Sequence, residues 1–157
     1  MPDRSLPVSL VLEDEEQARD FGLRLGAALQ PGMTLLLEGP VGAGKSHIAR
    51  SAIRAMAGAM IDVPSPTFTL VQSYDTPKAE VWHADLYRLT DPGEIEELGL
   101  ADAMGRDIVL IEWPDRLGSY RPSDGITLTL SDHGEGRLLR IQGAGASFLA
   151  ALGLAAS

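Results

Sequence analysis

The sequence contains no cysteine among its 157 residues, so the chain forms no disulfide and offers no thiolate for zinc binding or catalysis. It also lacks any run near the ~20 apolar residues of a membrane-spanning helix, and its first residues have no apolar signal segment. We therefore expect a cytoplasmic protein without a membrane role. Hydrophobic residues make up 45% of the chain and charged residues 22%, which predicts one globular domain over residues 1–157 with a substantial core.

Positive charge is scarce. The sequence has 13 Lys and Arg against 22 Asp and Glu, for a formal net charge of -9 at pH 7. An average surface of this sign repels a phosphate backbone. We therefore expect any nucleic acid to be met through a local basic patch or held by a partner protein.

Hydrophobic periodicity predicts strands and helices in alternation. Apolar residues three and four apart predict helices, and short apolar or alternating runs predict strands. The predicted helices are residues 14–29, 45–57, 91–99 and 146–156, and the predicted strands are residues 8–12, 33–38, 68–74, 79–85, 107–112, 126–130 and 137–141. This order predicts an α/β fold with a mixed, mainly parallel central sheet flanked by helices and a late antiparallel strand pair.

Residues 39–46, Gly-Pro-Val-Gly-Ala-Gly-Lys-Ser, match the phosphate-loop pattern G-x-x-x-x-G-K-[ST] at every required position. The loop lies between a predicted strand and a predicted helix, as the pattern demands. Its small residues let backbone N–H groups converge on phosphate oxygens, and the helix N-terminus adds a positive dipole. Lys45 is expected to reach the β- and γ-phosphates and Ser46 to bind magnesium, in a single P-loop NTPase-like domain.

A magnesium-triphosphate site also needs a carboxylate from the end of another strand. Two residues meet this condition, because Asp85 ends one predicted strand and Glu112 ends another that is apolar throughout its preceding four residues. His83 shares a strand face with Asp85, either as its partner or as a structural histidine. The three histidines lie on different predicted elements, so no histidine metal site is expected.

Two further features lie near these strands. Residues 64–69 carry three hydroxyl groups between prolines, which fits either a loop where Ser65 or Thr67 senses a γ-phosphate or a plain strand entry. Trp113 follows Glu112 directly, and it fits a partner contact, a plug over the site or a core residue equally well.

The ordered set of these motifs resembles the bacterial TsaE family, the ATPases of tRNA threonylcarbamoyladenosine biosynthesis. The resemblance covers about residues 10–140 and rests on GAGKS at 42–46, SPTFTLV at 65–71, HADLYRL at 83–89, DP at 91–92 with Glu94 and Glu97, and VLIEWP at 109–114. It implies a P-loop domain that binds Mg²⁺ and ATP and hydrolyses ATP slowly. The hydrolysis would support a TsaD and TsaB complex that attaches threonylcarbamoyl to the adenosine beside the tRNA anticodon, so that tRNA is met only through the complex.

The resemblance also assigns roles to residues. It implies that Lys45 binds phosphate, that Ser46 and Glu112 hold magnesium, and that Asp85 is a catalytic or metal-linked carboxylate. The nucleotide contacts that it implies are Glu15, Gly42, Ala43, Gly44, Lys45, Ser46, His47, Thr67 and Gly136, the last beside Arg137. Pro40 stands where the family commonly has Asp, and Ser46 stands where Thr is usual. Serine keeps the hydroxyl ligand, whereas Pro40 removes a carboxylate available for partner binding or water positioning.

Three other functions compete with this interpretation. A small-molecule kinase uses the same loop and could close Arg88, Arg116 and Arg121 over the phosphate, but no acceptor-site signature is present. A GTPase switch is disfavoured because the sequence has no Asn-Lys-x-Asp segment. A structural role with a relic loop is disfavoured by the intact Lys45–Ser46 pair. The oligomeric state stays open.

Overall fold

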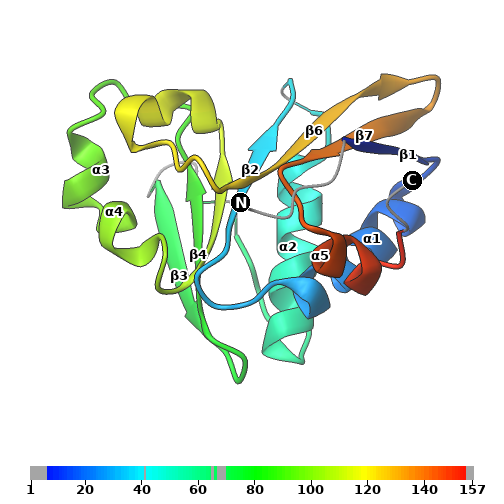
Figure 1. The fold of residues 1–157 in the computed structure, drawn as a ribbon, viewed down its shortest axis with the longest axis horizontal. Coiled ribbons are helices and arrows are strands. Elements are labelled where there is room, and N and C mark those ends of the chain that lie inside the picture. Colours follow the sequence, from blue (N-terminus) through cyan, green and yellow to red (C-terminus); the bar gives the residue numbers. More distant parts are fainter. Residues whose placement is uncertain (1–6, 41, 65, 67–69, 155–157) are drawn as a thin grey trace.

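The computed structural model describes residues 7–40, 42–64, 66 and 70–154, and it places a seven-stranded sheet at their centre (Figure 1). The strand order is β1-β7-β6-β2-β5-β4-β3. The strands are β1 (Val8–Leu12), β2 (Thr34–Glu38), β3 (Val71–Asp75), β4 (Glu80–Asp85), β5 (Ile108–Glu112), β6 (Ile126–His133) and β7 (Gly136–Gln142). All seven predicted strands are therefore confirmed within the described residues, with ends shifted by a few positions.

The middle of the sheet is parallel and its two sides are antiparallel. Strands β6, β2, β5 and β4 run parallel to one another, whereas β3 pairs antiparallel with β4, and β7 pairs antiparallel with β6 and β1. This arrangement confirms the mixed sheet with a late antiparallel pair. Because the central strands are parallel, their carboxyl ends meet at one edge, where Asp85 lies in register with Glu112.

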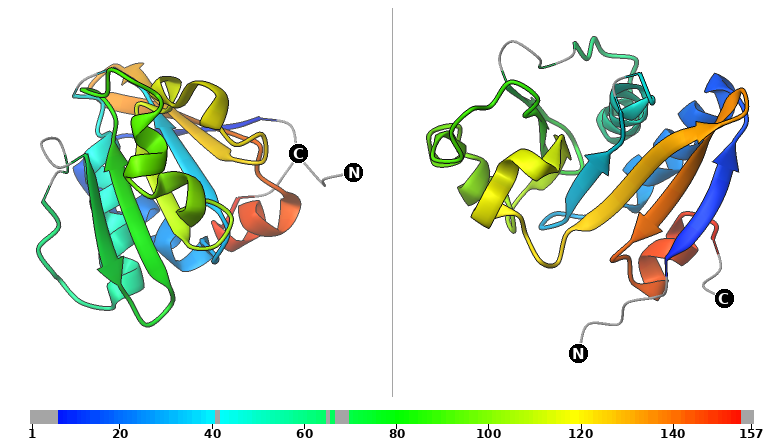
Figure 2. Two further views of the ribbon diagram at one scale, coloured as in Figure 1. Left: turned by 90° about the vertical axis from the view of Figure 1, so that its left-hand side faces the viewer. Right: turned by 90° about the horizontal axis from the view of Figure 1, so that it is seen from above.

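Helices cover both faces of the sheet, which makes three layers (Figures 1 and 2). One face carries α1 (Glu15–Ala28), α2 (Lys45–Ala57) and α5 (Ala146–Ala151), and the other carries α3 (Glu94–Glu97), α4 (Leu100–Ala103) and a 3₁₀ helix (Pro114–Tyr120). Strand side chains alternate between the faces, so Leu35 and Leu37 join the first core and Leu36 joins the second. This double coverage explains the uninterrupted apolar run of β2.

Two glycines let α1 pack closely against α2, and Asp14 caps the start of α1. A Cβ atom on Gly22 would lie 2.5 Å from the Cβ of Ser51, and one on Gly26 would lie 2.4 Å from the carbonyl oxygen of Ala52. Only glycine therefore lets the two helices approach this closely. At the start of α1, Asp14 accepts a hydrogen bond from the backbone N–H of Gln17 at 2.9 Å.

Three predicted boundaries were wrong, and one short helix was not predicted. The helix predicted over 91–99 begins later, because Asp91 accepts the backbone N–H of Gly93 and caps a turn, and Gly99 at φ +83° separates it from α4. The last helix ends at Ala151 instead of 156. The strand predicted from residue 68 begins at Val71, with 68 and 69 outside the described residues. The 3₁₀ helix had no counterpart among the predictions.

The helices of the described part of the chain include none that is both long and apolar enough to cross a membrane. The longest, α1, has 14 residues.

Candidate nucleotide-binding site

Glycines shape the loop between β2 and α2. Gly39, Gly42 and Gly44 have φ values of +145°, +84° and +101°, which L side chains rarely adopt. A Cβ on Gly39 would also lie 2.6 Å from the carbonyl oxygen of Leu130. The loop ends at the N-terminus of α2, a helix of 13 residues, whose free N–H groups and dipole favour an anion there.

Lys45 lies at the first position of α2 and only 5% of it is exposed. Its ammonium donates hydrogen bonds to the carbonyl oxygens of Gly39 and Pro40, and it stands 3.8 Å from the ring centroid of Trp113. The Trp113 ring also contacts Tyr87, with a centroid separation of 4.9 Å. Trp113 therefore covers the loop lysine through a cation–π contact and also packs, partly buried, against the second core, so its position fits both the plug and the core residue among the three alternatives.

Burial and charge act on Lys45 in opposite directions. Burial lowers the pKa of its ammonium below the usual value, and the carboxylates of Glu112, Asp85 and Asp115 oppose that shift. The lysine charge thus lies in a partly desolvated place where an incoming anion interacts with it strongly.

Ser46 and Glu112 face each other across the site. The Ser46 hydroxyl donates toward the two carboxylate oxygens of Glu112, at 2.9 and 3.0 Å. Glu112 is 2% exposed, and its Oε2 atom also accepts a hydrogen bond from Nε2 of His83 at 2.7 Å. Asp85 ends the neighbouring strand in register with Glu112, and its Oδ1 atom accepts the backbone N–H of Tyr87 at 3.0 Å.

This set of oxygen atoms suits magnesium. Mg²⁺ is commonly held by one or two carboxylates together with hydroxyl, water and substrate phosphate oxygens, not by a cage of protein ligands. Among the residues that the structure describes, no group of three or more His, Asp or Glu side chains is placed to hold a metal ion. Ser46 and Glu112 therefore fit a cation that also binds a phosphate, and they do not fit a closed metal centre.

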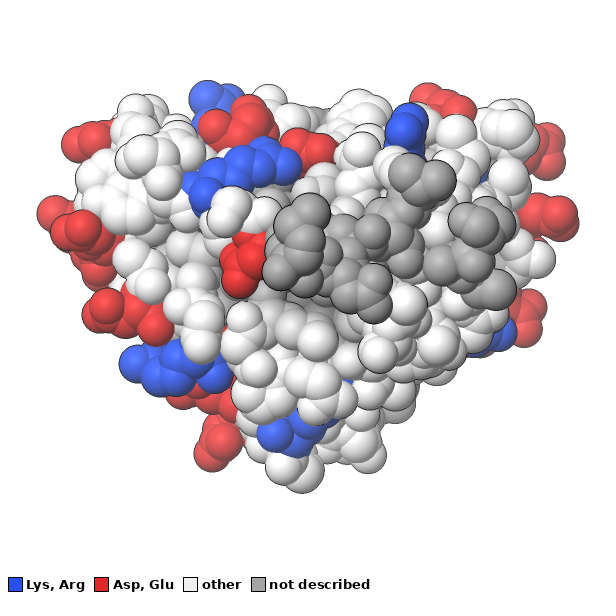
Figure 3. Space-filling model, viewed as in Figure 1, with Lys and Arg blue, Asp and Glu red and all other residues white. Residues whose placement is uncertain are grey.

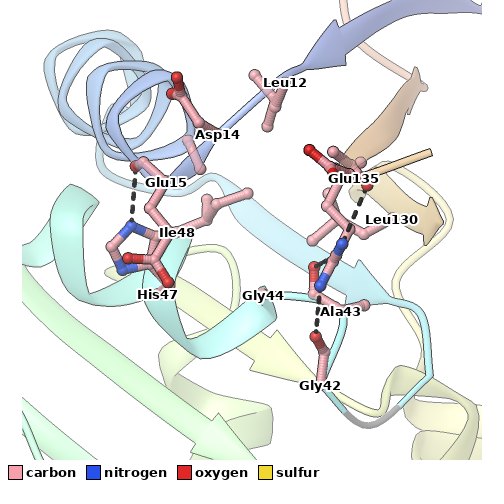
Figure 4. A pocket seen from close by; sticks show the side chains of 13 residues that line it. Leu12, Asp14, Glu15, Gly42, Ala43, Gly44, His47, Ile48, Leu130 and Glu135 are labelled. Atoms are coloured by element: carbon pink, nitrogen blue, oxygen red, sulfur yellow. Dashed lines mark hydrogen bonds between the residues drawn. The ribbon is translucent and has the colours of Figure 1, made fainter. Parts of the chain in front are cut away.

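Two of the pockets in the described part of the structure adjoin the phosphate loop. The larger has a volume of about 590 Å³ and is lined by Gly42, Ala43, Gly44, Lys45, Ser46, His47, Arg50, Asp85, Tyr87, Arg88, Glu112 and Trp113. The smaller has a volume of about 240 Å³ and is lined by Leu12, Asp14, Glu15, Ala18, Gly42, Ala43, Gly44, His47, Ile48, Leu130, Glu135, Gly136 and Arg137 (Figure 4). The two pockets share Gly42, Ala43, Gly44 and His47.

Hydrogen bonds between elements that are distant in the sequence border the smaller pocket. His47 donates from Nε2 to the carbonyl oxygen of Glu15 at 3.3 Å, which joins α2 to α1. On the opposite side, the Arg137 guanidinium donates to the carbonyl oxygens of Ala43 and Gly42, each at 3.1 Å. Figure 4 shows the hydrogen bond between His47 and Glu15 on one side of a mainly apolar hollow and the hydrogen bonds to Gly42 and Ala43 on another. The hollow is lined by residues that include Ile48 and Leu130.

The structure brings most of the predicted site residues to these two pockets. Glu15 and Gly136 line the smaller one, Asp85 and Glu112 line the larger one, and residues 42–44 and 47 line both. Thr67 and Ser65 lie outside the described residues.

Sequence reasoning missed some of these contacts. The strand pattern left His83 either as a partner of Asp85 or as a structural histidine, and it did not indicate that Nε2 of His83 donates to Glu112 on the neighbouring strand. Tyr87 and Leu130 were not predicted in the site, and no local signal in the sequence marks either residue.

A mixed sheet with parallel central strands and a G-x-x-x-x-G-K-S loop between β2 and α2 define the P-loop NTPase fold. Residues 12–139 match the profile of the family described as "Threonylcarbamoyl adenosine biosynthesis protein TsaE". The chain therefore belongs to the TsaE family, as the motifs predicted.

Several curated proteins of this family are similar to the chain. The "tRNA threonylcarbamoyladenosine biosynthesis protein TsaE" of Rickettsia bellii is 38% identical over 120 residues, which cover 76% of this chain and 83% of that protein. The protein of the same name from Haemophilus influenzae is 31% identical over 136 residues, covering 83% and 85% of the two chains. The crystal structure of Bacillus subtilis YdiB superposes with a TM-score of 0.74 at 20% identity, covering 94% of this chain and 92% of that one, which shows a shared fold.

Proposed function

We propose that this chain is a Mg²⁺-dependent ATPase that acts with TsaD and TsaB to form threonylcarbamoyladenosine next to the anticodon of tRNA. The observation that carries the proposal is the placement of Lys45 and Ser46 at the start of α2 opposite the buried Glu112. Membership of the TsaE family supports the pathway.

The residues of the larger pocket suit a triphosphate. The N–H groups at the start of α2 and the Lys45 ammonium would bind phosphate oxygens, because both supply positive charge in a partly desolvated place. Ser46 and Glu112 would hold magnesium, which when bound neutralises charge that develops on the phosphates. Asp85 lies beside Glu112 at the same sheet edge, where its carboxylate can orient an attacking water molecule.

The smaller pocket suits the nucleoside. Its walls include Leu12, Ala18, Ile48 and Leu130, which offer apolar surface for a flat base, while Glu15 and Glu135 supply polar groups at its edge. Residues 42–44 of the phosphate loop line both pockets, so one nucleotide bound at the loop can extend into both.

The kinase alternative receives less support from the positions of its three arginines. Arg88 lines the larger pocket, but Arg121 donates to Glu38 at 3.2 Å and Arg116 lines a separate hollow with Leu89 and Thr90. The three side chains therefore do not converge on one phosphate in this structure, as closure over a transferring phosphoryl group requires.

The test compares tRNA nucleosides by mass spectrometry in cells depleted of the protein and supplied with wild type, Lys45→Ala or Lys78→Ala. Lys45 and Lys78 are the two lysines of the sequence, and Lys78 contacts the end of α1, away from the loop. We expect threonylcarbamoyladenosine to fall on depletion and to return with wild type and Lys78→Ala only. Full recovery with Lys45→Ala would contradict the need for nucleotide binding.

A binding experiment with purified protein separates the nucleotide from the pathway. Calorimetry should show binding of Mg-ATP to wild type and to Lys78→Ala, and at least about 100-fold weaker binding to Lys45→Ala, because the loop then lacks its charged phosphate ligand. Equal binding by Lys45→Ala would overturn the phosphate-site assignment.

A further inference from the structure

His83 on β4 is a buried residue that contacts Glu112, one of the residues that line the larger pocket. Its side chain is 1% exposed and the side chain of Glu112 is 3% exposed, with 2.7 Å between Nε2 and Oε2. Because both groups are shielded from water, little solvent competes for this hydrogen bond. The contact joins two neighbouring parallel strands just below the sheet edge where the phosphate loop lies.

The two ring nitrogens of His83 have different surroundings. Nδ1 is buried and has no hydrogen-bond partner among the residues that the structure describes. An ionised carboxylate only accepts hydrogen bonds, so the ring nitrogen that contacts Glu112 carries the proton and donates it. The network therefore assigns the Nε2–H tautomer, which donates to the carboxylate of Glu112.

The carboxylate of Glu112 is thus held from two sides. Ser46 reaches it from α2 and His83 reaches it from β4. A glutamate has three rotatable side-chain bonds, so without such partners its carboxylate samples several orientations. The hydrogen bond from His83 occupies a lone pair of Oε2 and fixes the plane of the carboxylate beside the Ser46 hydroxyl.

We propose that His83 is a positioning residue that orients Glu112 and thereby sets the affinity of the site for magnesium. The proposal rests on the proposed function, because it concerns the same Mg²⁺ and ATP site. Hydrogen bonds from outer residues commonly orient carboxylates that bind metal ions, and losing one typically weakens metal binding about 10- to 100-fold. His83 itself touches neither phosphate loop pocket among the residues lining them.

Three substitutions separate positioning from simple core filling. His83→Leu introduces an apolar side chain of similar size and removes the donor. His83→Gln places an amide N–H at about the reach of Nε2, whereas His83→Asn is polar but too short to reach Glu112. A positioning role predicts that the glutamine variant recovers magnesium binding and that the other two do not.

The measurement is the Mg²⁺ concentration for half-maximal ATP hydrolysis by the full chain at saturating ATP, with ATP binding in excess chelator measured separately. We expect the half-maximal Mg²⁺ concentration to rise about 10-fold or more in His83→Leu and His83→Asn, and to stay within about threefold of wild type in His83→Gln. Binding of ATP without metal should change less than about twofold in all three, because the loop and Lys45 are untouched.

Leu149→Ala is the control for stability, because Leu149 is buried on α5, and no residue of α5 lines either pocket. It should lower the melting temperature and leave the half-maximal Mg²⁺ concentration unchanged. The proposal is overturned if His83→Asn matches wild type, or if His83→Gln is impaired as much as His83→Asn. His83→Asn and His83→Gln decide the matter even where His83→Leu fails to fold. If wild type itself shows no Mg²⁺-dependent binding of ATP, the proposed function fails and this inference fails with it.

Discussion

At the scale of single residues, the contacts of the site converge on Glu112. Its carboxylate accepts hydrogen bonds from Ser46 and His83, and its charge opposes the lowering of the Lys45 pKa. A buried carboxylate is stable only when such partners surround it. Glu112 thus links strand β4, strand β5 and the start of α2 in one polar cluster.

Replacing Glu112 by glutamine tests this cluster. Glu112→Gln keeps the size and most hydrogen-bond capacity, so we expect the fold to persist with a small change in melting temperature. Loss of the charge should weaken Mg²⁺-dependent ATP binding by more than the roughly 10- to 100-fold that loss of an outer partner costs. Calorimetry with and without Mg²⁺ measures this effect. If the variant only unfolds, Glu112 is structural, and Asp85 becomes the preferred ligand.

Arg137 on β7 forms hydrogen bonds with the phosphate loop. Its guanidinium donates to the carbonyl oxygens of Gly42 and Ala43, so it holds two peptide groups of the loop in place. We expect Arg137→Met to weaken ATP binding about 10-fold, because two hydrogen bonds from a charged group are lost. The matched control is Arg140→Met on the same strand, where the side chain is exposed. Equal affinities for the two variants would exclude a role for Arg137.

At the scale of elements, the packing of α1 on α2 places Glu15 beside His47. Gly26→Ala would bring a methyl group to within 2.4 Å of the Ala52 carbonyl oxygen, so the helices must move apart. We expect a loss of about 1–3 kcal/mol in the free energy of unfolding, measured by urea denaturation. Leu23→Ala at an exposed position of α1 is the control, with an expected change below about 1 kcal/mol. A Gly26→Ala variant more stable than wild type would show that α1 and α2 can move apart at this position without loss of stability.

The elements also show which features the sequence determines locally. The helix over 45–57 was predicted to the residue, because the loop motif and the apolar spacing both define it. The 3₁₀ helix and α4 escaped prediction because such short helices hold too few residues to show a period. Strand β1 was predicted, but its pairing with β7, more than a hundred residues later, leaves no local trace.

The same distinction applies to the site. Lys45 and Ser46 belong to a contiguous motif, and Glu112 was placed at the end of a buried strand from its apolar run alone. The contact of His83 with Glu112 depends on the register of two parallel strands, which sequence periodicity does not determine. For this reason the strand pattern offered only a pair with Asp85 or a structural histidine, whereas the structure shows a hydrogen bond from His83 to the neighbouring strand.

At the scale of the whole molecule, charge decides how the protein can meet tRNA. The formal net charge is -9, and on the face shown in Figure 3 acidic side chains lie along both lateral edges and are mixed with basic ones between them. Binding of a nucleic acid without sequence preference depends on basic side chains that neutralise phosphates. The TsaE family acts in a pathway named for a tRNA nucleoside. Because the net charge of this chain is negative, we expect it to meet tRNA through partner proteins.

This argument predicts that the isolated protein binds tRNA weakly. In 150 mM salt we expect a Kd above roughly 10⁻⁴ M, the weak end of the usual range for binding without sequence preference, because the net charge of -9 opposes approach. Fluorescence anisotropy of labelled tRNA, with the protein alone and with TsaD and TsaB added, measures it. TsaD and TsaB without this chain provide the control, and a further anisotropy rise on adding the chain is expected only in their presence. Micromolar binding by the isolated protein that weakens steeply with salt would reveal a basic tRNA surface and contradict contact through partners alone.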